Sequence, residues 1–387
     1  MAPDWTADGL SHFDRASSIW GMKTPWRTMC PGTFGELVQG RIAKRNFLVT
    51  LPISKFSRAT IPQSMKEARP SLAFSKCDRF IEALGQLLGR SLSCQFSLES
   101  QLARGKGLAS SSADLTAVGT ALLHSLEIDA CFHPSLISRA AAQVEPTDGV
   151  MYPGINAYAQ HECQLIESFG SFDFELAGVL LENEVDTVSY NSKSLAYTAQ
   201  EEASFELAFG WAREGIRNKD LSLVGRASSL SAEINERFLP KREFKRARLL
   251  QARLGSPGLV VAHSGTAIGL LVPQGASAGE KARMTGELQS LYGLPAEIYS
   301  TWMAGPQLLS RPQRQLGSPV IYLRGKNRVV QASRVPQLSF GTVLMGAAGE
   351  FEGFAIDGNS SVEQLALAAE QVRQVFGDIE IETSHAC

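Results

Sequence analysis

The pattern of apolar and polar positions changes along the chain from short runs to helical spacing and back. Apolar runs bounded by proline, glycine or polar residues predict strands at 27–30, 47–53, 57–61, 95–98, 163–168, 178–181, 259–262, 268–272 and 296–300. Apolar residues three and four positions apart predict a helix through Leu115 and Leu126, and further helices over 76–89, 135–145, 199–217, 220–236, 241–254 and 278–292. This order of elements indicates an α+β fold with mostly antiparallel sheets.

The length of the chain predicts more than one domain. A single hydrophobic core rarely serves 387 residues, so we expect two or three domains. The elements place a first domain at 26–160 and a second at 161–300. Residues 1–25 form an N-terminal extension, and both a frayed tail and a segment packed back through its tryptophans stay open. Residues 301–318, rich in proline and poor in apolar periodicity, predict a linker to a small α/β unit at 319–387.

The expected C-terminal unit has its own short elements. Strands at 320–323 and 329–332 flank a polar turn and predict a hairpin. Ser360 and Glu363 have the spacing of a capping box that opens a helix, and 379–382 predicts a last strand. Regulatory ligand binding, dimerisation and a second activity all stay open as its role, and so does a homodimer of the whole chain.

Composition excludes several classes of partner. The chain is 44% hydrophobic with a net charge of −2, which gives no electrostatic footprint for nucleic acid or an anionic membrane. The six cysteines lack metal-ligand spacing and predict reduced thiols. Residues 1–25 lack the apolar core of a signal peptide, and no run of about 18 apolar residues occurs. We therefore expect a cytoplasmic protein that acts on a small molecule.

The segment 105–114, with the sequence Gly-Lys-Gly-Leu-Ala-Ser-Ser-Ser-Ala-Asp, predicts a phosphate site. Small residues let backbone N–H groups approach an anion, and the helix that follows points its positive end at the same place. Lys106 could supply a point charge, and Ser111 could bind Mg²⁺. A simple turn with an exposed lysine, and helix capping by the serines, stay open as alternatives. The segment does not have the Walker A or GxGxxG spacing.

Two carboxylates follow the helix predicted over 135–145. Glu145 and Asp148 lie three residues apart in a segment rich in turn-forming residues, with Pro146 ending the helix. One acid could hold a metal ion and the other could accept a hydroxyl proton, as phosphoryl transfer requires. A helix end followed by an Asx-turn is the alternative.

Three motifs, in order, resemble those of the GHMP kinases. The central motif is Gly-Leu-Ala-Ser-Ser-Ser-Ala at 107–113. The first is Pro-Gly-Thr-Phe-Gly-Glu-Leu-Val-Gln-Gly at 31–40, and the third is Ala-His-Ser-Gly-Thr-Ala-Ile-Gly at 262–269. Within this superfamily the chain resembles the L-threonine kinase branch of cobalamin biosynthesis, through its first motif, Gly-Lys-Gly-x-Ala-Ser-Ser, Glu-Pro-Thr-Asp and the segment 234–240. The resemblance covers about residues 26–300.

The resemblance implies a two-domain kinase fold and an ATP-dependent phosphotransferase with an alcohol acceptor. It implies that L-threonine is converted to O-phospho-L-threonine. The residues expected to hold the ATP phosphates are Gly105, Lys106, Gly107, Leu108, Ala109, Ser110, Ser111 and Ser112. Ser111 and Glu145 resemble the Mg²⁺ ligands, and Asp148 resembles the aspartate that faces the acceptor hydroxyl. Thr33 stands where many GHMP kinases have a lysine, so positioning and charge neutralisation are expected to dominate.

An amino-acid acceptor also needs partners for its charged groups. Glu36 is the candidate for the ammonium group. Arg237, Gln39, His263, Ser264 and Gly265 are candidates for the carboxylate or its surroundings, since arginine offers a bidentate fork. A solvated helix-surface arginine is the alternative for Arg237. L-Serine, homoserine or another hydroxylated amino acid stays open as the acceptor, and a non-catalytic ligand sensor is the alternative of another class.

Overall fold

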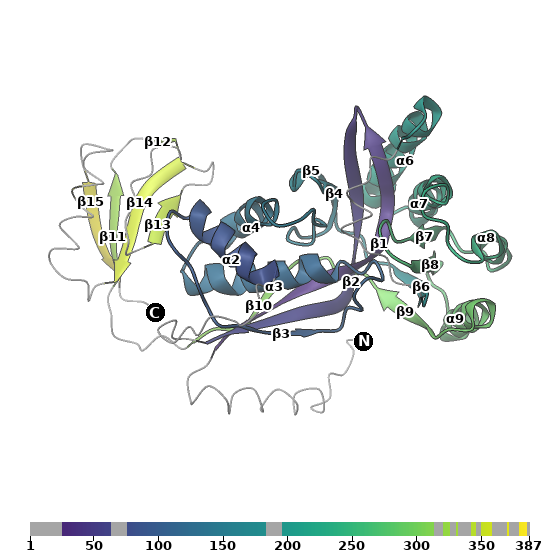
Figure 1. The fold of residues 1–387 in the computed structure, drawn as a ribbon, viewed down its shortest axis with the longest axis horizontal. Coiled ribbons are helices and arrows are strands. Elements are labelled where there is room, and N and C mark those ends of the chain that lie inside the picture. Colours follow the sequence, from purple (N-terminus) through teal and green to yellow (C-terminus); the bar gives the residue numbers. More distant parts are fainter. Residues whose placement is uncertain are drawn as a thin grey trace.

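The computed structural model describes residues 25–62, 76–182 and 196–312, and beyond these 320–325, 330–331, 342–345, 350–357, 370 and 379–384. In these residues the chain forms a large sheet with helices packed around it and a second, smaller sheet (Figure 1). All strand pairs are antiparallel, which confirms the predicted α+β class. No helix within these ranges combines the length and apolarity that a membrane crossing requires.

The larger sheet follows the order β5–β4–β2–β1–β7–β8–β6–β9, with β3 paired to β2 and β10 to β1. Its strands are β1 (Trp26–Ile42), β2 (Arg45–Ile61), β3 (Ser97–Ser100), β4 (Ile155–Ala159), β5 (Gln164–Gly170), β6 (Glu175–Leu180), β7 (Leu259–Val261), β8 (Ala267–Leu271), β9 (Ala296–Ser300) and β10 (Gln307–Ser310). The strands predicted within 161–300 lie within two residues of their observed positions, except that β6 begins three residues before the strand predicted at 178–181. The strand predicted at 95–98 is shifted by two residues.

The long hairpin of β1 and β2 runs through the middle of this sheet. A two-residue turn with positive φ at Ala43 and Lys44 joins the strands, as a tight hairpin requires. The strands predicted at 27–30, 47–53 and 57–61 are parts of it. The segment 31–40 was not expected to be strand because proline and glycine usually end strands. Here register shifts near Pro31, Thr33 and Glu36 accommodate those residues within β1.

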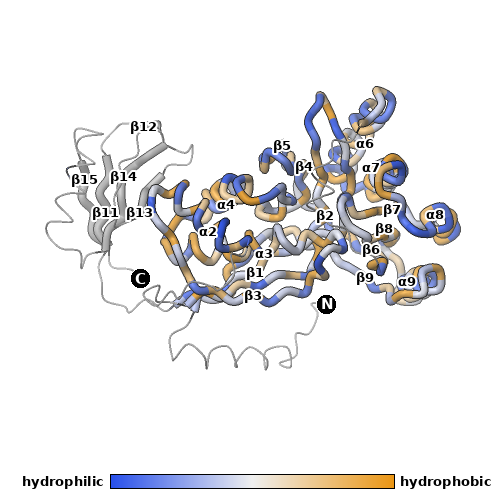
Figure 2. The backbone as a smooth tube through the Cα atoms, in the orientation of Figure 1, coloured by the Kyte–Doolittle hydropathy of each residue, from blue (hydrophilic) through white to orange (hydrophobic). Residues whose placement is uncertain are grey.

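The helices are α2 (Lys76–Leu87), α3 (Ser110–Ser125), α4 (His133–Ala141), α6 (Ala199–Asn218), α7 (Leu221–Asn235), α8 (Phe244–Arg253) and α9 (Ala278–Tyr292), with a 3₁₀ turn at Ala130–Phe132. Helix α3 packs against β1 and β2, between the sheet and the pair α2 and α4. It is buried almost all around, from Ser112 to Leu123. The other group, α6 to α9, carries both hydrophilic and hydrophobic residues and covers the opposite end of the sheet (Figure 2).

Two expectations about the C-terminal region are corrected. The predicted linker at 301–318 contains β10, which pairs with β1 and so belongs to the larger sheet. Alternation in its four residues is too short to stand out beside the surrounding prolines. The predicted hairpin also fails: β11 (Val320–Gly325) pairs with β14 (Glu350–Asp357) and β15 (Ile379–Ser384), and β12 (Val330–Gln331) pairs with β14.

The strand predicted at 379–382 lies within β15, and β13 (Thr342–Met345), which no sequence pattern indicated, pairs with β14. The expected capping box at Ser360 and Glu363, with its helix, and the extension 1–24 lie outside the described residues. The domain boundaries remain predictions.

The three motif segments meet at one place in the fold. The carbonyl of Lys106 accepts hydrogen bonds from Thr266 N (3.0 Å) and Ala267 N (2.9 Å). The carbonyls of Gly107 and Leu108 accept from Gly35 N (3.0 Å) and Thr33 N (3.2 Å) of β1. The loop before α3 is therefore fixed by backbone contacts to both other motifs.

This junction is packed too closely for side chains. A Cβ atom on Gly265 would lie 2.2 Å from the Gly107 nitrogen, and neither atom belongs to a group that can rotate away. Gly265→Ala should therefore lower the free energy of unfolding by roughly 1–3 kcal/mol, measured by urea denaturation.

Gly286→Ala is the matched control. Gly286 lies inside α9 with no atom within 4 Å of its added Cβ, so alanine should stabilise the helix by about 0.5–1 kcal/mol. Equal stability of Gly265→Ala and the natural protein would contradict this packing.

Candidate active site

The first turn of α3 is open to a ligand. Ala109 precedes the helix in the left-handed conformation (φ 53°), and no side chain caps the helix. The first N–H groups of an uncapped helix have no partner within the helix and carry the positive end of its dipole. Gly105 and Gly107 also have positive φ, which lets the loop turn tightly. The capping alternative for the serines is therefore not what the structure adopts.

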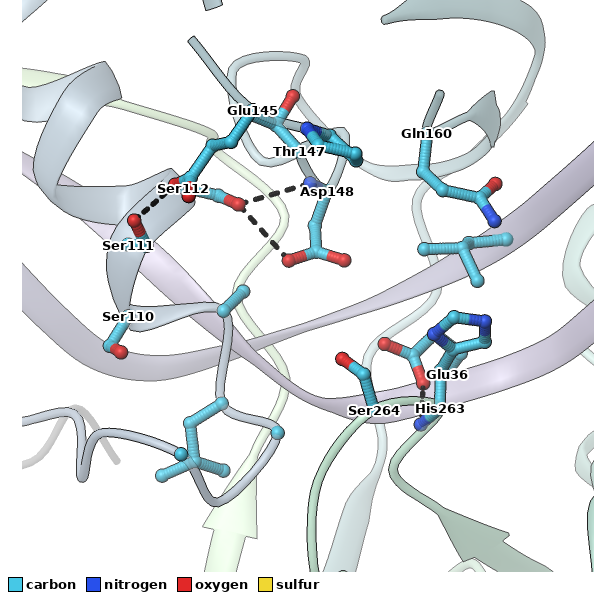
Figure 3. Close-up of a pocket in the computed structure, with 16 residues that line it drawn as sticks. Glu36, Ser110, Ser111, Ser112, Glu145, Thr147, Asp148, Gln160, His263 and Ser264 are labelled. Carbon is cyan, nitrogen blue, oxygen red and sulfur yellow. Dashed lines mark hydrogen bonds between the residues drawn. The ribbon is translucent and has the colours of Figure 1, made fainter. Parts of the chain in front are cut away.

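Two of the serines instead hold the two acids. Ser111 Oγ donates a hydrogen bond to the Glu145 carboxylate (Figure 3). Ser112 Oγ lies 3.1 Å from Asp148 Oδ2, to which it donates, and it accepts from Asp148 N at 3.0 Å. Residues far apart in the sequence are thus joined at the first turn of α3, and the acids line one pocket with the loop 107–112.

The helix before the acids is shorter than expected. Helix α4 ends at Ala141 rather than at Glu145, and single turns carry the chain on, with Glu145 N donating to Ala141 O at 3.0 Å. Pro146 disfavours helical angles at Glu145, so the chain leaves the helix before the acid. That irregular exit lets Glu145 and Asp148 both face α3.

The opposite wall of the pocket comes from β1 and from the segment after β7. Glu36, His263 and Ser264 line it, together with Gln160 after β4 (Figure 3). The backbone N–H of His263 donates to Glu36 Oε2 at 2.6 Å, which fixes the carboxylate at this wall. Asp148 and Glu36 therefore face the same space from two sides.

Burial raises the pKa of both facing acids. Burial raises the pKa of Asp148 to about 6, and the Glu145 charge adds to the shift against the lowering effect of Ser112. Burial and the charge of Asp148 raise the pKa of Glu36 well above its usual value. Burial lowers the pKa of His263 to about 3, so this imidazole is neutral at physiological pH. The pocket therefore favours a cationic ligand group.

Sequence reasoning missed Lys76. This first residue of α2 donates from Nζ to Glu145 Oε2 and lies 3.5 Å from Ser111 Oγ. Nothing in its sequence neighbourhood signals this role, since 69 residues separate it from Glu145. Its ammonium group places a positive charge between the two expected metal ligands.

That contact bears on whether the site suits Mg²⁺. Ser111 and Glu145 present two hard oxygen ligands to one point, and a cationic group already lies there. No cluster of three histidine, cysteine or acidic side chains suited to a metal occurs among the described residues. A Mg²⁺ ion that also takes phosphate oxygens and water needs only one protein carboxylate, so the residues fit.

Several expected ligands lie elsewhere. Arg237 does not line the pocket: its guanidinium donates to both carboxylate oxygens of Glu201, at 2.7 and 2.6 Å, near the start of α6. Lys106 Nζ donates to the carbonyls of Leu181 (2.9 Å) and Glu182 (2.7 Å). Gly265 packs on Gly107 instead of lining the pocket. Arg237 was predicted because its guanidinium can bind a carboxylate through two hydrogen bonds. In the structure that guanidinium is paired with Glu201.

Comparisons with known proteins find kinases among both similar sequences and similar folds. The chain is 26% identical to the L-threonine kinase of Citrobacter freundii over 253 residues, which are 63% of this chain and 85% of the relative. It is 26% identical to the L-threonine kinase of Salmonella typhimurium over 268 residues, 67% of this chain and 86% of the relative. No family model matches the chain.

The fold matches a solved kinase structure. A homoserine kinase from Cytophaga hutchinsonii superposes with a TM-score of 0.57 at 13% identity, covering 75% of this chain and 98% of the other. This likeness shows a common fold. In fold and in the order of its motifs, the chain is similar to the GHMP kinases, which are phosphotransferases with an alcohol group as acceptor. Within that class, the relatives named above are L-threonine kinases.

The buried charge of Asp148 predicts a pH-dependent stability. Its pKa is about 6 when folded and 3.8 when unfolded, so the folded state binds more protons between these values and loses stability as pH rises. The full loss is about 3 kcal/mol, of which about 1 kcal/mol falls between pH 5 and pH 7.5. Asp148→Asn removes the titrating group. The unfolding free energy of this variant minus that of the natural protein should therefore increase by about 1 kcal/mol between pH 5 and pH 7.5.

Urea unfolding at the two pH values measures the difference. Asp173→Asn, at an exposed aspartate, is the control and should follow the natural protein at both. A constant difference between Asp148→Asn and the natural protein at both pH values would contradict the buried charge.

Proposed function

We propose that the chain transfers the terminal phosphate of ATP to the side-chain hydroxyl of a free amino acid, with L-threonine as the acceptor. The observation that carries the proposal is the pair of hydrogen bonds that holds Glu145 and Asp148 on the open first turn of α3. The names of the two relatives support threonine among hydroxylated amino acids.

The loop would bind the phosphates, because the uncapped N–H groups of α3 and the positive end of its dipole face the pocket. Ser111 and Glu145 would hold the metal ion of the nucleotide. A bound Mg²⁺ neutralises charge on the phosphate oxygens. Lys76 would leave its contact with Glu145 or turn its ammonium towards the phosphates.

Asp148 would orient the acceptor hydroxyl and take its proton. Its pKa of about 6 keeps most of the carboxylate ionised near pH 7, close to the value at which a base works best. Thr33 is buried beneath the loop, and its N–H donates to Leu108 O at 3.2 Å, so this position supplies no cation to assist the base. Positioning and charge neutralisation would therefore carry most of the rate.

Homoserine is the second candidate acceptor. It is favoured by the likeness in fold to a homoserine kinase, although that likeness is at 13% identity. Homoserine is an isomer of threonine that carries a primary hydroxyl on Cγ in place of the secondary hydroxyl on Cβ, so a panel of acceptors separates the two.

The test is nucleotide turnover with a panel of acceptors. The chain with ATP and Mg²⁺ should release ADP in the presence of L-threonine, with smaller rates for L-serine and L-homoserine and a negligible rate without acceptor. Mass spectrometry should identify O-phospho-L-threonine. Asp148→Asn should lower the turnover by roughly 10²-fold or more while nucleotide binding persists.

A preference for L-homoserine would change the assigned acceptor and would support the same phosphoryl-transfer reaction. Nucleotide binding without ADP release on any hydroxylated amino acid would overturn the proposal and favour a ligand sensor.

A further inference from the structure

Three buried polar side chains lie on or beside the wall that Glu36 forms, and one of them, Gln39, lacks hydrogen-bond partners. Glu36, Gln39 and Lys241 are 8%, 3% and 6% exposed. Both the oxygen and the nitrogen of the Gln39 side-chain amide have no hydrogen-bond partner. Buried polar groups are nearly always paired, and an unpaired one is costly. Such a cluster indicates a place prepared for a ligand.

The register of the hairpin puts Glu36 and Gln39 on the face of the pocket. Gln39 pairs with Leu48 and Glu36 with Thr50, and the register shift at Leu37 keeps both on one face. Leu48 lines the pocket. Gly40 faces the other way, where a Cβ would meet the ring of Phe205 on α6. The side chain of Gln39 thus lies on the same face of the hairpin as Glu36, next to the residues that line the pocket.

Lys241 follows α7, the helix that packs against β1. Ser231 on α7 accepts a hydrogen bond from Gln39 N at 2.9 Å, which places the end of α7 along the free edge of β1. The Lys241 backbone N–H donates to Glu236, and its Nζ has one carbonyl contact, Leu239 O at 3.3 Å. An ammonium group has three donors, so two are left for another acceptor.

The charge of Lys241 influences the pocket, although its side chain is not among those that line it. The Lys241 charge acts on Glu36 and on His263, both of which line the pocket. Burial lowers the pKa of Lys241 to about 8 despite the acids nearby. A ligand with a carboxylate at Lys241 and an ammonium at Glu36 would satisfy both buried groups at once.

We propose that Lys241 and Gln39 bind the α-carboxylate of the acceptor amino acid and that Glu36 binds its α-ammonium. The pocket then admits a zwitterion and rejects alcohols without both charges. Asp148, across the pocket from Glu36, would face the side-chain hydroxyl. Lys241 takes the role that sequence reasoning gave to Arg237. This subsite rests on the proposed function, because it names how that acceptor is recognised.

The experiment combines charge-deleting variants with charge-deleted substrates. The natural protein should use L-threonine and discriminate against L-threonine amide and N-acetyl-L-threonine. Lys241→Met should lower kcat/KM for L-threonine roughly 30-fold or more, mainly through KM, because a buried charge partner is lost. It should use L-threonine amide about as well as the natural protein does. Glu36→Gln should lose the discrimination against N-acetyl-L-threonine.

Lys245→Met is the matched control, since Lys245 is an exposed lysine on α8. It should leave every rate unchanged. Thermal unfolding of Lys241→Met separates recognition from structure. Because Lys241 offsets part of the buried charge at Glu36, the variant should unfold at a lower temperature and still be folded in the assay. A folded Lys241→Met variant that still discriminates against L-threonine amide would overturn the proposal.

Calorimetric titration with L-threonine keeps the two proposals apart. Turnover of L-threonine with unchanged discrimination in Lys241→Met overturns the subsite and leaves the kinase reaction standing. Binding of L-threonine that Lys241→Met abolishes, without turnover in the natural protein, supports the subsite and overturns the kinase reaction. Absence of both turnover and binding in the natural protein overturns both.

Discussion

The site depends on the two hydrogen bonds from the first turn of α3 to the acids after α4. Ser111 and Ser112 are neighbours, yet they hold different carboxylates, Glu145 and Asp148. Adjacent helix positions point about 100° apart, so one acid is directed towards the loop and the other towards the acceptor wall. Because α3 is buried almost all around, packing holds its first turn in place. The two acids are held in place through their hydrogen bonds to that turn.

The electrostatics follow from that arrangement. Three acids surround a small pocket, and two of them are buried enough to raise their pKa. Lys76 offsets part of this charge at Glu145, and Lys241 offsets part at Glu36. The remaining demand for positive charge would be met by a metal ion on one side and by the ammonium of an amino acid on the other. A phosphoryl-transfer site with a zwitterionic acceptor is therefore consistent with the charges of the chain itself.

Much of the fold could be predicted from the sequence, because amphipathic spacing decides the helices from α6 to α9 and the strands between them. The site acids and the serine loop were also predictable, since motif order brought them together. The long β1 strand was not, because Pro31 and its neighbouring glycines resemble strand breakers, and β-bulges that tolerate them depend on pairing with β2. Lys76 and Lys241 had no local signal, because their proximity to the acids arises only from tertiary packing. Arg237 is the opposite case: its residue type suggested a ligand, but tertiary packing pairs it with Glu201.

The division of labour between the two serines is tested most directly by the Mg²⁺ dependence of turnover in Ser111→Ala and Ser112→Ala. Ser111→Ala should raise the Mg²⁺ concentration needed for half-maximal rate, because a proposed metal ligand is lost. Ser112→Ala should lower the rate at saturating Mg²⁺ and leave the half-maximal Mg²⁺ concentration unchanged. This variant removes the hydrogen bond to Asp148 and keeps the one to Glu145. Equal Mg²⁺ dependence in the two variants, or the reverse pattern, would contradict this division between the two serines.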